Sequence, residues 1–398
     1  MRASISEIDV SGRTALVRVD LNVPMSGGTI TNAERLHRLV PGLRDLLDRG
    51  AKVVLMSHFG RPKGTVVPAM SLAPVATAIG ELLARPVSFV PDWRGTQAKA
   101  AVAALQPGEA LVLENLRFDP GEEANDPDLA KDLAAMGDLY INDAFSAAHR
   151  AHASTQGLAK LLPAFAGHLM AAELGALEMA LSNPDRPVMA IVGGAKVSTK
   201  FDLLFNLITK VDFLVIGGGM ANTFLAAQGL DVGGSLHEPE LKAQARDVLA
   251  RADAIGCNVI LPLDTICAPK IDAGDQAQSM PMDRIPSDQM ILDFGPKSIE
   301  TILDILPKMK TLLWNGPLGA FEFPPFQVAT QAVAKAVAEQ TQVGNLQSVA
   351  GGGDTVAALD QAGVLHDLTY VSTAGGAFLE WMEGRDLPGV AALNANSV

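Results

Sequence analysis

Short runs of β-branched and aliphatic residues alternate with longer amphipathic stretches along almost the whole chain. In the first half, TALVRVDLNVP (14–24) precedes NAERLHRLVPGLRDLLDRG (32–50). In the second half, PVMAIVGGAK (187–196) and DFLVIGGGMANTF (212–224) also lead into helix-like segments. Continuous apolar strands separated by helices are typical of parallel sheets that are covered on both faces. The sequence therefore predicts an α/β fold with doubly wound, Rossmann-like parallel sheets.

The length of the chain predicts two domains. At 398 residues it exceeds what one ordinary core supports, so two similar-sized domains are expected. One long helical pattern, 167–182, is followed by NPDRP, after which the strand–helix rhythm restarts. We therefore expect a first domain over 1–166, a connecting helix over 167–182 and a second domain over 183–385, with a cleft between the domains.

Charge and composition narrow the class of protein. A net charge of -13 disfavours general binding to nucleic acid or to an anionic membrane surface. Cys257 and Cys267 fit neither a disulfide framework nor a metal-ligand spacing, which favours a reducing compartment. The N-terminus lacks the apolar core of a signal peptide, and the most apolar long stretch, 161–181, contains two glutamates, a histidine and a proline. We expect a cytoplasmic protein without a membrane span.

Cations and hydrogen-bonding residues follow the predicted strands of the first half. In open α/β sheets, ligands bind beyond the carboxyl ends of the strands. Taken singly, each such residue is better explained as a surface residue or a local salt-bridge partner. Their shared position favours a basic pocket for a small phosphorylated or carboxylated ligand. The residues are Asp20, Asn22, Arg35, His58, Arg61, Arg117, His149, Arg150 and His152.

Glycine occupies the corresponding positions in the second half. A single glycine turn is explained by the need to reverse the chain. Five in one domain favour backbone amides and helix N-termini that hold phosphate groups. No Walker A loop occurs, and no G-x-G-x-x-G opens the first βαβ unit, so a nucleotide would be held in another way. The turns are GGAK (193–196), GGGMAN (217–222), NGPLG (315–319), GGGDT (351–355) and AGG (374–376).

Two lysines and one aspartate stand out among these glycines. Lys196 and Lys200 are four positions apart, a spacing at which like charges repel on one helical face. They could form a solvated face, but beside glycine turns they suit the charge of a phosphate. Asp354 could hold Mg²⁺ next to phosphate oxygens, or it could cap the helix that follows. The motif alone leaves both interpretations of Asp354 open.

Taken together, these residues resemble the phosphoglycerate kinase family. The segments RVDLNVP, SHFGRP, ENLRF, NDAFSAAHRAHAST, VGGAKVSTK, VIGGGMANTF, WNGPLGAFE and AGGGDT occur in the family's order. The match runs from residue 14 to LPGVAAL near the end of the chain. Two positions depart from the glycine that the family often has there, Ser146 and Ala374. The alanine at 374 puts in doubt only the first backbone N–H donor of the loop, because Gly375 and Gly376 are still present.

The resemblance implies a role for each matching residue. The phosphoglycerate would be bound by Asp20, Asn22, Arg35, His58, Arg61, Arg117 and Arg150. Arg35 would also steady the group in transfer, and Lys200 would contact that group and the nucleotide phosphates, with Lys196 close by. The nucleotide would be bound by Lys200, Gly217, Gly218, Gly219, Pro317, Glu322, Gly352, Gly353, Asp354 and Thr355, with the adenine near Pro317 and the ribose on Glu322. Asp354 would coordinate Mg²⁺, and the catalytic set would be Arg35, Lys196, Lys200, Gly352 and Gly375.

The activity that the resemblance implies is a reversible, Mg²⁺-dependent phosphoryl transfer of glycolysis and gluconeogenesis. It converts 1,3-bisphosphoglycerate and ADP into 3-phosphoglycerate and ATP. Both nucleophiles, a carboxylate and a phosphate oxygen, react without a general base, so positioning and charge neutralisation would carry the catalysis. The resemblance further implies a monomer, in-line transfer on closure of the domains, and a tail over 386–398 that returns to the first domain.

Two other classes of protein share a two-domain α/β architecture. A nicotinamide-dependent oxidoreductase would need a ribose-binding acid about 20 residues after a G-x-G-x-x-G opening, which the first half lacks. A non-catalytic ligand-binding protein would not need paired lysines beside a metal-binding carboxylate, and an exported one would need a signal segment. A coupled assay for ATP-dependent phosphorylation of 3-phosphoglycerate separates the three.

Overall fold

The chain forms two compact units in the computed structural model, which describes residues 5–395. One unit contains the residues up to Leu174 and those from Asp386 onward, and the other is Gly175–Arg385. The boundary at Leu174 falls inside helix α6 (His168–Leu181), which occupies the range where the sequence predicts the connecting helix. Residues 1–4 and 396–398, which belong to the predicted first domain and its tail, lie outside the described residues.

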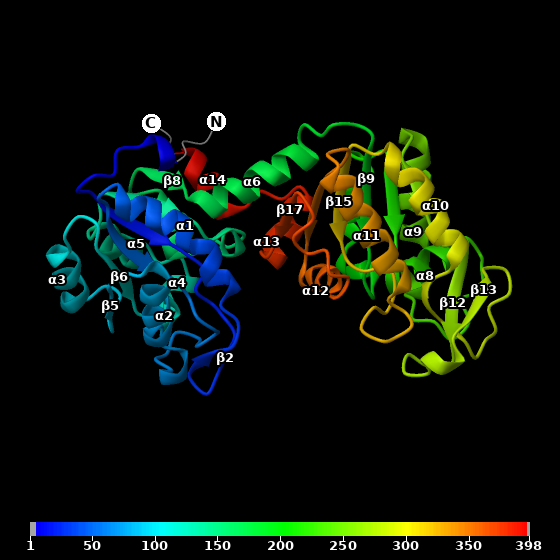
Figure 1. Cartoon of the computed structure of the whole chain (residues 1–398), viewed down its shortest axis with the longest axis horizontal. Coiled ribbons are helices and arrows are strands. Elements are labelled where there is room, and N and C mark those ends of the chain that lie inside the picture. The colour runs from blue at the N-terminus through cyan, green and yellow to red at the C-terminus, as the bar shows by residue number, and fades with distance from the viewer. Residues whose placement is uncertain (1–4, 396–398) are drawn as a thin grey trace. The chain divides into compact units, whose positions relative to one another are not determined.

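The first unit is built on a six-stranded parallel sheet with the order β5-β6-β4-β1-β7-β8 (Figure 1). The strands are β1 (Thr14–Arg18), β4 (Lys52–Met56), β5 (Val87–Val90), β6 (Ala110–Leu113), β7 (Leu139–Asn142) and β8 (Ala164–Ala166). The connecting helices are α1 (Glu34–Asp48), α2 (Ala73–Leu83), α3 (Thr96–Ala104), α4 (Pro120–Glu123) and α5 (Pro127–Ala134), and β2 (Met25–Ser26) and β3 (Thr29–Ile30) form a small hairpin.

Burial of consecutive strand residues shows that both faces of this sheet are covered. Ala15 and Val17 join the core that α1 and α2 complete, whereas Leu16 between them points to the opposite face and is also fully buried. Side chains alternate between the faces of a strand, so both faces must carry packed elements. Helix α1 contributes leucines at intervals of three and four residues, which form one apolar stripe.

The second unit contains a second six-stranded parallel sheet, with the order β11-β10-β9-β15-β16-β17. Its strands are β9 (Val188–Val192), β10 (Phe213–Ile216), β11 (Asn258–Ile260), β15 (Thr311–Asn315), β16 (Gln347–Gly351) and β17 (Tyr370–Ser372). The α-helices of this unit beyond α6 are α7 (Phe201–Leu207), α8 (Gly218–Ala227), α9 (Lys242–Ile255), α10 (Pro296–Ile305), α11 (Val328–Gln342), α12 (Gly353–Gln361) and α13 (Gly375–Met382). The prediction of an α/β fold with parallel sheets is confirmed.

A three-stranded antiparallel sheet in the second unit was not predicted. Strands β13 (Gln278–Pro281), β12 (Asp264–Ala268) and β14 (Met290–Phe294) lie side by side in that order. The sequence of this region lacks the strand–helix alternation, because β13 pairs with a neighbour in sequence and needs no helical crossover. This sheet is separate from the parallel sheet of the unit, and its strand β14 supplies one wall of the second pocket described below.

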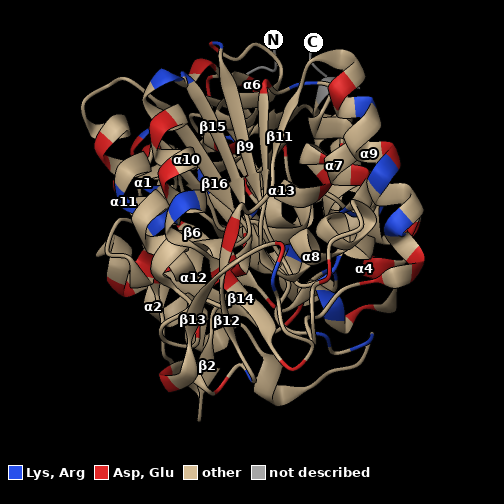
Figure 2. Cartoon of the chain, turned by 90° about the vertical axis from the view of Figure 1, so that its right-hand side faces the viewer, with Lys and Arg blue, Asp and Glu red and all other residues tan. Residues whose placement is uncertain are grey.

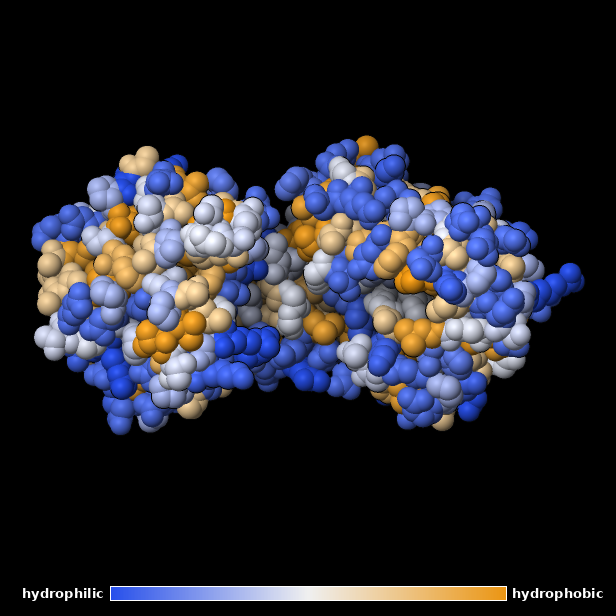
Figure 3. Space-filling view, turned by 90° about the horizontal axis from the view of Figure 1, so that it is seen from below, coloured by the Kyte–Doolittle hydropathy of each residue, from blue (hydrophilic) through white to orange (hydrophobic). Residues whose placement is uncertain are grey.

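Helices α9, α10 and α11 of the second unit carry charged residues, whereas the central strands of its parallel sheet carry none. Figure 2 shows Lys, Arg, Asp and Glu on α9, α10 and α11, whereas β9, β15 and β16 carry none. Polar and apolar side chains are interspersed on the face of the molecule seen in Figure 3. Within residues 5–395, no helix combines the length and the apolar character that a membrane crossing requires.

The last described helix belongs to the first unit. Helix α14 (Pro388–Ala395) begins after Leu387, whose side chain is buried together with those of Val390 and Leu393. The backbone N–H of Gly389 donates a hydrogen bond to the carbonyl of Ala148, at 2.8 Å. Helix α14 thus packs against the loop that follows β7, which contributes to the first pocket.

Candidate active site

The first pocket lies where the loops after β1, β4, β6 and β7 converge, at the carboxyl ends of the strands. It is a cavity of about 220 Å³. Five of the residues predicted to bind phosphoglycerate line it, namely Asn22, His58, Arg61, Arg117 and Arg150. The other lining residues are Gly60, Ser146, Ala147, His149 and His152. The structure thus collects cations and histidines from three separate stretches of sequence, and an asparagine from a fourth, around one small space.

Asp20 and Arg35 form a pair beside this cavity. Arg35 Nη1 lies 3.2 Å from Asp20 Oδ1 and 3.1 Å from Oδ2, and it donates a 2.7 Å hydrogen bond to the carbonyl of Asn22. Ser146 Oγ donates to Asp20 Oδ2 and the backbone N–H of Asn22 donates to Oδ1. Burial opposes ionisation of Asp20, but the charge of Arg35 and these hydrogen bonds outweigh it and lower its pKa. Asp20 is therefore a fixed carboxylate next to the cations.

The serine that departs from the family's usual glycine has a defined task in this network. Ser146 lies in the short 3₁₀ helix after β7, lines the cavity and donates its hydroxyl proton to Asp20. A glycine at this position would leave Asp20 with one hydrogen bond fewer. The departure at Ser146 thus adds a partner for a site residue.

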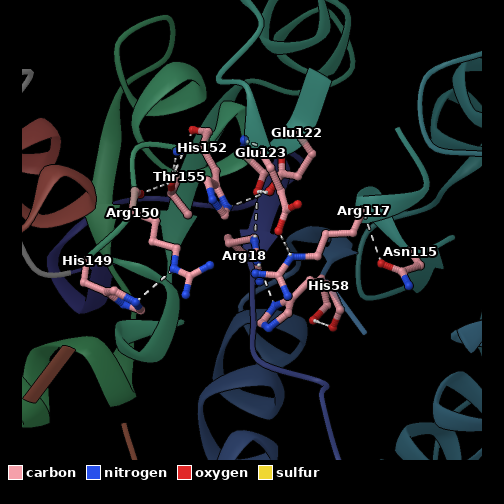
Figure 4. Close-up of polar contacts among 12 residues, drawn as sticks. Arg18, His58, Asn115, Arg117, Glu122, Glu123, His149, Arg150, His152 and Thr155 are labelled. Atoms are coloured by element: carbon pink, nitrogen blue, oxygen red, sulfur yellow. Dashed lines mark hydrogen bonds and ion pairs between the residues drawn. The ribbon is translucent and has the colours of Figure 1, made fainter. Parts of the chain in front are cut away.

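A buried arginine that the sequence analysis did not select lies behind the cavity. Arg18, the last residue of β1, is fully buried, and its Nη2 is 3.1 Å from His58 Nδ1 (Figure 4). Its Nε donates to Ser154 Oγ, which in turn donates to Glu122 Oε1 at 2.6 Å. One signal for Arg18 was present in the sequence, because a charged residue inside an apolar strand has to be paired when it is buried.

Arg117, Arg150 and His152 of the first pocket differ in their protein partners and in their burial. Arg117 donates a 2.8 Å hydrogen bond to the carbonyl of Gly60 and pairs with Glu123 at 3.1 Å. Arg150 is exposed, and its Nε donates to His149 Nε2 at 3.1 Å (Figure 4). Burial, followed by the nearby arginines, lowers the pKa of His152 to about 4, so its ring is neutral near pH 7.

The second pocket is a cavity of about 270 Å³ in the other unit. Of the residues predicted to bind nucleotide, those that line it are Gly218, Gly219, Pro317, Glu322 and Asp354. The antiparallel sheet adds Met290, Ile291, Leu292 and Asp293 from β14. Gly217, Gly352, Gly353, Thr355, Lys196 and Lys200 are not part of this lining. The pocket therefore combines apolar side chains with exposed backbone and only a few charged groups.

Some of the glycines in these loops serve packing between loops. A Cβ on Gly193 would lie 1.8 Å from the carbonyl oxygen of Pro317, so the loops after β9 and β15 can only meet at a glycine. A Cβ on Gly218, which has a φ of +67°, would lie 2.6 Å from the carbonyl oxygen of Gly194. By contrast, a Cβ on Gly353 or on Gly375 would meet nothing within 4 Å. Only the latter two glycines face open space where a ligand could approach the backbone.

Lys200 is tethered by three hydrogen bonds. Its ammonium group donates to the carbonyl of Gly193, to the carbonyl of Asn315 at 3.1 Å and to Asn315 Oδ1 at 2.7 Å. Burial lowers the pKa of Lys200 to about 8, against the opposing effect of Asp354. Lys196, in contrast, is exposed, and it makes no hydrogen bond or ion pair through its side chain within residues 5–395.

The expectation that both lysines lie early on one helical face is wrong. Lys196 precedes the 3₁₀ helix Val197–Thr199, and Lys200 stands between this helix and α7. The change from a 3₁₀ to an α-helix at Lys200 breaks the regular geometry that would bring residues four positions apart onto one face. The two ammonium groups therefore have different environments, that of Lys200 half-buried and that of Lys196 solvated.

Of the two interpretations of Asp354, the structure does not show the helix cap. Helix α12 has Gly352 at its N-cap position without a side-chain cap, and Asp354 is exposed in the first turn and lines the second pocket. Thr355 accepts a 2.7 Å hydrogen bond from the backbone N–H of Gly316 and so links two loops. Within residues 5–395, no three His, Cys, Asp or Glu side chains converge on one point. Asp354 alone fits Mg²⁺, which often takes one protein carboxylate together with phosphate oxygens.

The other departure from the family's glycine, Ala374, has an ordinary backbone conformation. Its φ is -90°, and its N–H donates to Ser372 Oγ at 3.1 Å. Because this φ is open to every kind of residue, an alanine is accommodated here without strain. Gly375, with a φ of +35°, follows it at the start of α13.

Asp293 is a pocket residue that the sequence analysis missed. It is 1% exposed, accepts a 3.0 Å hydrogen bond from the N–H of Ala329, and its pKa is raised by burial to about 7. It follows an apolar run in β14, as Asp20 follows one in the first half. The antiparallel sheet that carries it was not predicted, so its position could not be inferred.

Comparisons with known proteins give one consistent result. Residues 5–385 match the family model described as phosphoglycerate kinase. The chain is 60% identical over 390 residues to a phosphoglycerate kinase of Ruegeria sp. (strain TM1040), covering 98% of both chains, and 58% identical over 386 residues to one of Methylorubrum extorquens (strain PA1), covering 97% and 96%. Its fold is similar to the solved phosphoglycerate kinase of Coxiella burnetii, with a TM-score of 0.94, 41% identity and coverage of 100% of both chains. It is also similar to that of Pyrococcus horikoshii OT3, with a TM-score of 0.80, 30% identity and coverage of 99% and 98%.

Proposed function

Because this chain belongs to the phosphoglycerate kinase family, we propose that its two pockets divide the two substrates of a glycolytic phosphoryl transfer between them. The first pocket binds 3-phosphoglycerate or 1,3-bisphosphoglycerate, and the second binds ATP or ADP. The observation that carries this assignment is the chemical contrast between the pockets. One is lined by arginines and histidines, and the other by apolar groups, glycine backbone and the exposed carboxylates of Glu322 and Asp354, of which Asp354 lies near a helix N-terminus.

The first pocket suits a small ligand with two anionic ends. Arg61, Arg117 and Arg150 present guanidinium groups, which bind phosphate and carboxylate oxygens in pairs. Asn22 and the fixed carboxylate Asp20 offer an amide and an acceptor for the substrate hydroxyl. Arg35 is held by Asp20 and Asn22, so its charge is oriented before the substrate arrives, and we assign to it the further task of steadying the transferred group.

The second pocket suits a nucleotide. Gly217, Gly218, Gly219 and Pro317 border the adenine, and Glu322 accepts a hydrogen bond from the ribose. The phosphates lie at the amino end of α12, where Gly352, Gly353 and Thr355 contribute backbone amides and the helix dipole favours negative charge. Asp354 would hold Mg²⁺ against the phosphate oxygens, and the metal would supply charge neutralisation there.

The lysines and Gly375 complete the catalytic set. Lys200 carries its charge next to the glycine loops, and contact with a phosphate oxygen requires it to exchange at least one of its three protein hydrogen bonds. The solvated side chain of Lys196 supplies a second positive charge. The Cα of Gly375 borders open space at the start of α13, and its backbone N–H belongs to the first turn of that helix, where N–H groups have no partner within the helix, so it can donate to the transferred group.

The chemistry needs no general base. A carboxylate of 3-phosphoglycerate or a β-phosphate oxygen of ADP attacks directly, in line with the leaving oxygen, and the surrounding cations stabilise the charge of the transferred group. Direct transfer requires the two substrates to meet with water excluded. We place the hinge for this closure in α6, the returning tail and the loop before α13, and we expect a cytoplasmic monomer.

A coupled assay tests the proposal. ATP-dependent phosphorylation of 3-phosphoglycerate is followed through reduction of the product by an excess of a nicotinamide-dependent dehydrogenase. Arg150→Ala should raise the KM for 3-phosphoglycerate by about tenfold or more and leave the KM for ATP nearly unchanged. Asp354→Ala should raise the KM for ATP and the Mg²⁺ concentration needed for activity, and leave the KM for 3-phosphoglycerate nearly unchanged. If Arg150→Ala raised only the KM for ATP, the assignment of the pockets would be reversed.

A further inference from the structure

A cation is buried directly behind a histidine of the first pocket. Arg18 is fully buried and does not line the cavity, whereas His58, which does, is 8% exposed. Arg18 Nη2 lies 3.1 Å from His58 Nδ1, its Nε donates to Ser154 Oγ at 2.9 Å, and its Nη1 donates to the carbonyl of Val19 at 2.6 Å (Figure 4). All three nitrogens of the guanidinium are therefore engaged within the protein.

The chemistry of this contact fixes the state of His58. A guanidinium group has only N–H donors and is not deprotonated in proteins, so it cannot accept a hydrogen bond. Nδ1 of His58 must then be the acceptor and carry no proton. The ring is consequently neutral, with its single proton on Nε2, the nitrogen that Arg18 does not contact. Protonation of Nδ1 would set two N–H donors against each other and place a second positive charge beside Arg18.

The other charges around His58 do not reverse this conclusion. Asp20 is the carboxylate that favours a charged ring, but Arg35, Ser146 and Asn22 already use its oxygens. Arg117 and Arg35 disfavour a charged ring, as Arg18 does. Burial, followed by Arg18, brings the pKa of His58 well below the ordinary value.

A fully buried carboxylate balances the charge of Arg18 from the far side. Glu122 accepts the hydroxyl proton of Ser154 on Oε1 and the backbone N–H of Ser154 on Oε2, at 2.6 and 2.9 Å. Tyr140 supports the same segment, because its hydroxyl donates to the carbonyl of Ser154 at 2.9 Å. The order Glu122, Ser154, Arg18, His58 keeps the compensating negative charge away from the histidine. Glu122 therefore does not compete with His58 for Nη2 of Arg18.

We propose that Arg18 is a positioning residue that holds His58 neutral with its proton on Nε2, so that His58 always presents a hydrogen-bond donor to an oxygen of phosphoglycerate. The proposal rests on the proposed function only for the identity of the ligand. The state of His58 in the free protein is independent of that function and can be measured by itself.

The direct test is ¹⁵N NMR of the full-length protein labelled at histidine. Long-range proton–nitrogen correlations recorded between pH 5.5 and 8.5 report the tautomer of each ring, and loss of one signal set in His58→Gln assigns His58. We expect the Nε2–H tautomer of His58 across the whole range. A ring protonated on Nδ1, or a titration with a midpoint near the ordinary histidine value of about 6.5, would overturn the proposal.

A variant pair tests the role of Arg18. Arg18→Met alone would leave Glu122 buried without its compensating charge, so the double variant Arg18→Met with Glu122→Gln is used, and Glu122→Gln alone is the matched control. In the double variant, His58 should populate both tautomers and titrate. In Glu122→Gln it should keep the parental tautomer, because the contact with Arg18 remains.

The pH dependence of the KM for 3-phosphoglycerate distinguishes this role of Arg18 from a purely structural one. At pH 8, about half of the His58 rings in the double variant carry the proton on Nδ1 and lack the Nε2–H donor, so the KM for 3-phosphoglycerate relative to the parent should rise by about twofold. Toward pH 6 the ring becomes protonated, Nε2 again donates, and this ratio should fall back. A ratio independent of pH would overturn the role of Arg18. Absence of 3-phosphoglycerate phosphorylation in the parent, with the Nε2–H tautomer intact, would instead count against the proposed function.

Discussion

Lys200 Nζ lies 2.7 Å from Asn315 Oδ1 and 3.1 Å from the carbonyl oxygen of the same residue. This contact joins the loop after β9 to the end of β15, two neighbouring strands that are more than a hundred residues apart in sequence. It orients the ammonium group with uncharged acceptors while burial disfavours its charge. An anion that binds next to Lys200 would therefore stabilise its charged form.

The first expectation concerns the pH dependence that this environment creates. A lysine is charged below its pKa, and that of Lys200 is lowered by burial to about 8, so the charge is lost as pH rises through this value. The kcat/KM for ATP, which reports the free enzyme, should therefore fall above about pH 8. Asn315→Asp places a carboxylate on the ammonium group and should move this limb to higher pH.

Asn315→Ala is the matched control for that experiment. Both variants lose the hydrogen bond that Asn315 Nδ2 donates to the carbonyl of Gly351, at 2.8 Å. Only the alanine also removes an acceptor of the charged lysine, so its limb should move to lower pH. Shifts of the two limbs in the same direction would show that Lys200 is not the titrating group.

The second expectation is that Lys200→Ala lowers kcat by two or more orders of magnitude and changes nucleotide affinity much less. A charge that stabilises the transferred group mainly in the transition state acts on kcat, whereas uniform binding acts on KM. Steady-state kinetics combined with equilibrium titration of ADP separates the two effects. An unchanged kcat would remove Lys200 from the catalytic set.

The loop positions of the site follow from the sequence because they depend on local patterns. Asp20, His58 and Arg117 come directly after apolar runs that become β1, β4 and β6, and the parallel arrangement brings these strand ends to one edge. The aspartate of GGGDT was placed at a pocket by the same reasoning.

The partners of these residues could not be predicted in the same way. Arg18 meets Ser154 across 136 positions, and Lys200 meets Asn315 across 115, with no periodicity that links them. The same holds for the glycines, because packing between loops at Gly193 and open space at Gly353 produce the same letter in the sequence. Only the tertiary packing of the loops decides which backbone is covered and which is left to a ligand.

The third expectation concerns Ser146 and the ionisation of Asp20. Ser146 donates to Asp20, whose pKa is lower in the folded protein than in the unfolded chain. A depressed carboxyl pKa contributes stability that is present above the unfolded value of about 3.9 and is lost as pH falls through the folded value. Ser146→Ala should therefore lower the free energy of unfolding by about 1–2 kcal/mol at pH 7, and by less as the solution is acidified through the range where Asp20 takes up its proton.

Chemical denaturation of Ser146→Ala at pH 7 and in acid measures this difference. The control is the same substitution in an Asp20→Asn background, where no carboxylate titrates and the loss should no longer depend on pH. An effect of Ser146→Ala that is equal at all pH values in the parental background would mean that the hydroxyl does not act through Asp20.

The last expectation separates the two kinds of glycine in the second unit. Gly193→Ala places a Cβ against the carbonyl of Pro317, backbone against backbone, so the loops after β9 and β15 must separate. We expect a loss of about 2 kcal/mol or more in the free energy of unfolding. Gly353→Ala meets no atom within 4 Å, so the free protein should keep its stability or gain slightly, as alanine favours a helix by about 1 kcal/mol over glycine. Its new methyl group would instead stand where nucleotide phosphates approach the start of α12, which should weaken ADP binding. Thermal unfolding with and without Mg-ADP measures both effects, and the assignment of Gly353 fails if its variant gains as much stability from the nucleotide as the parent does.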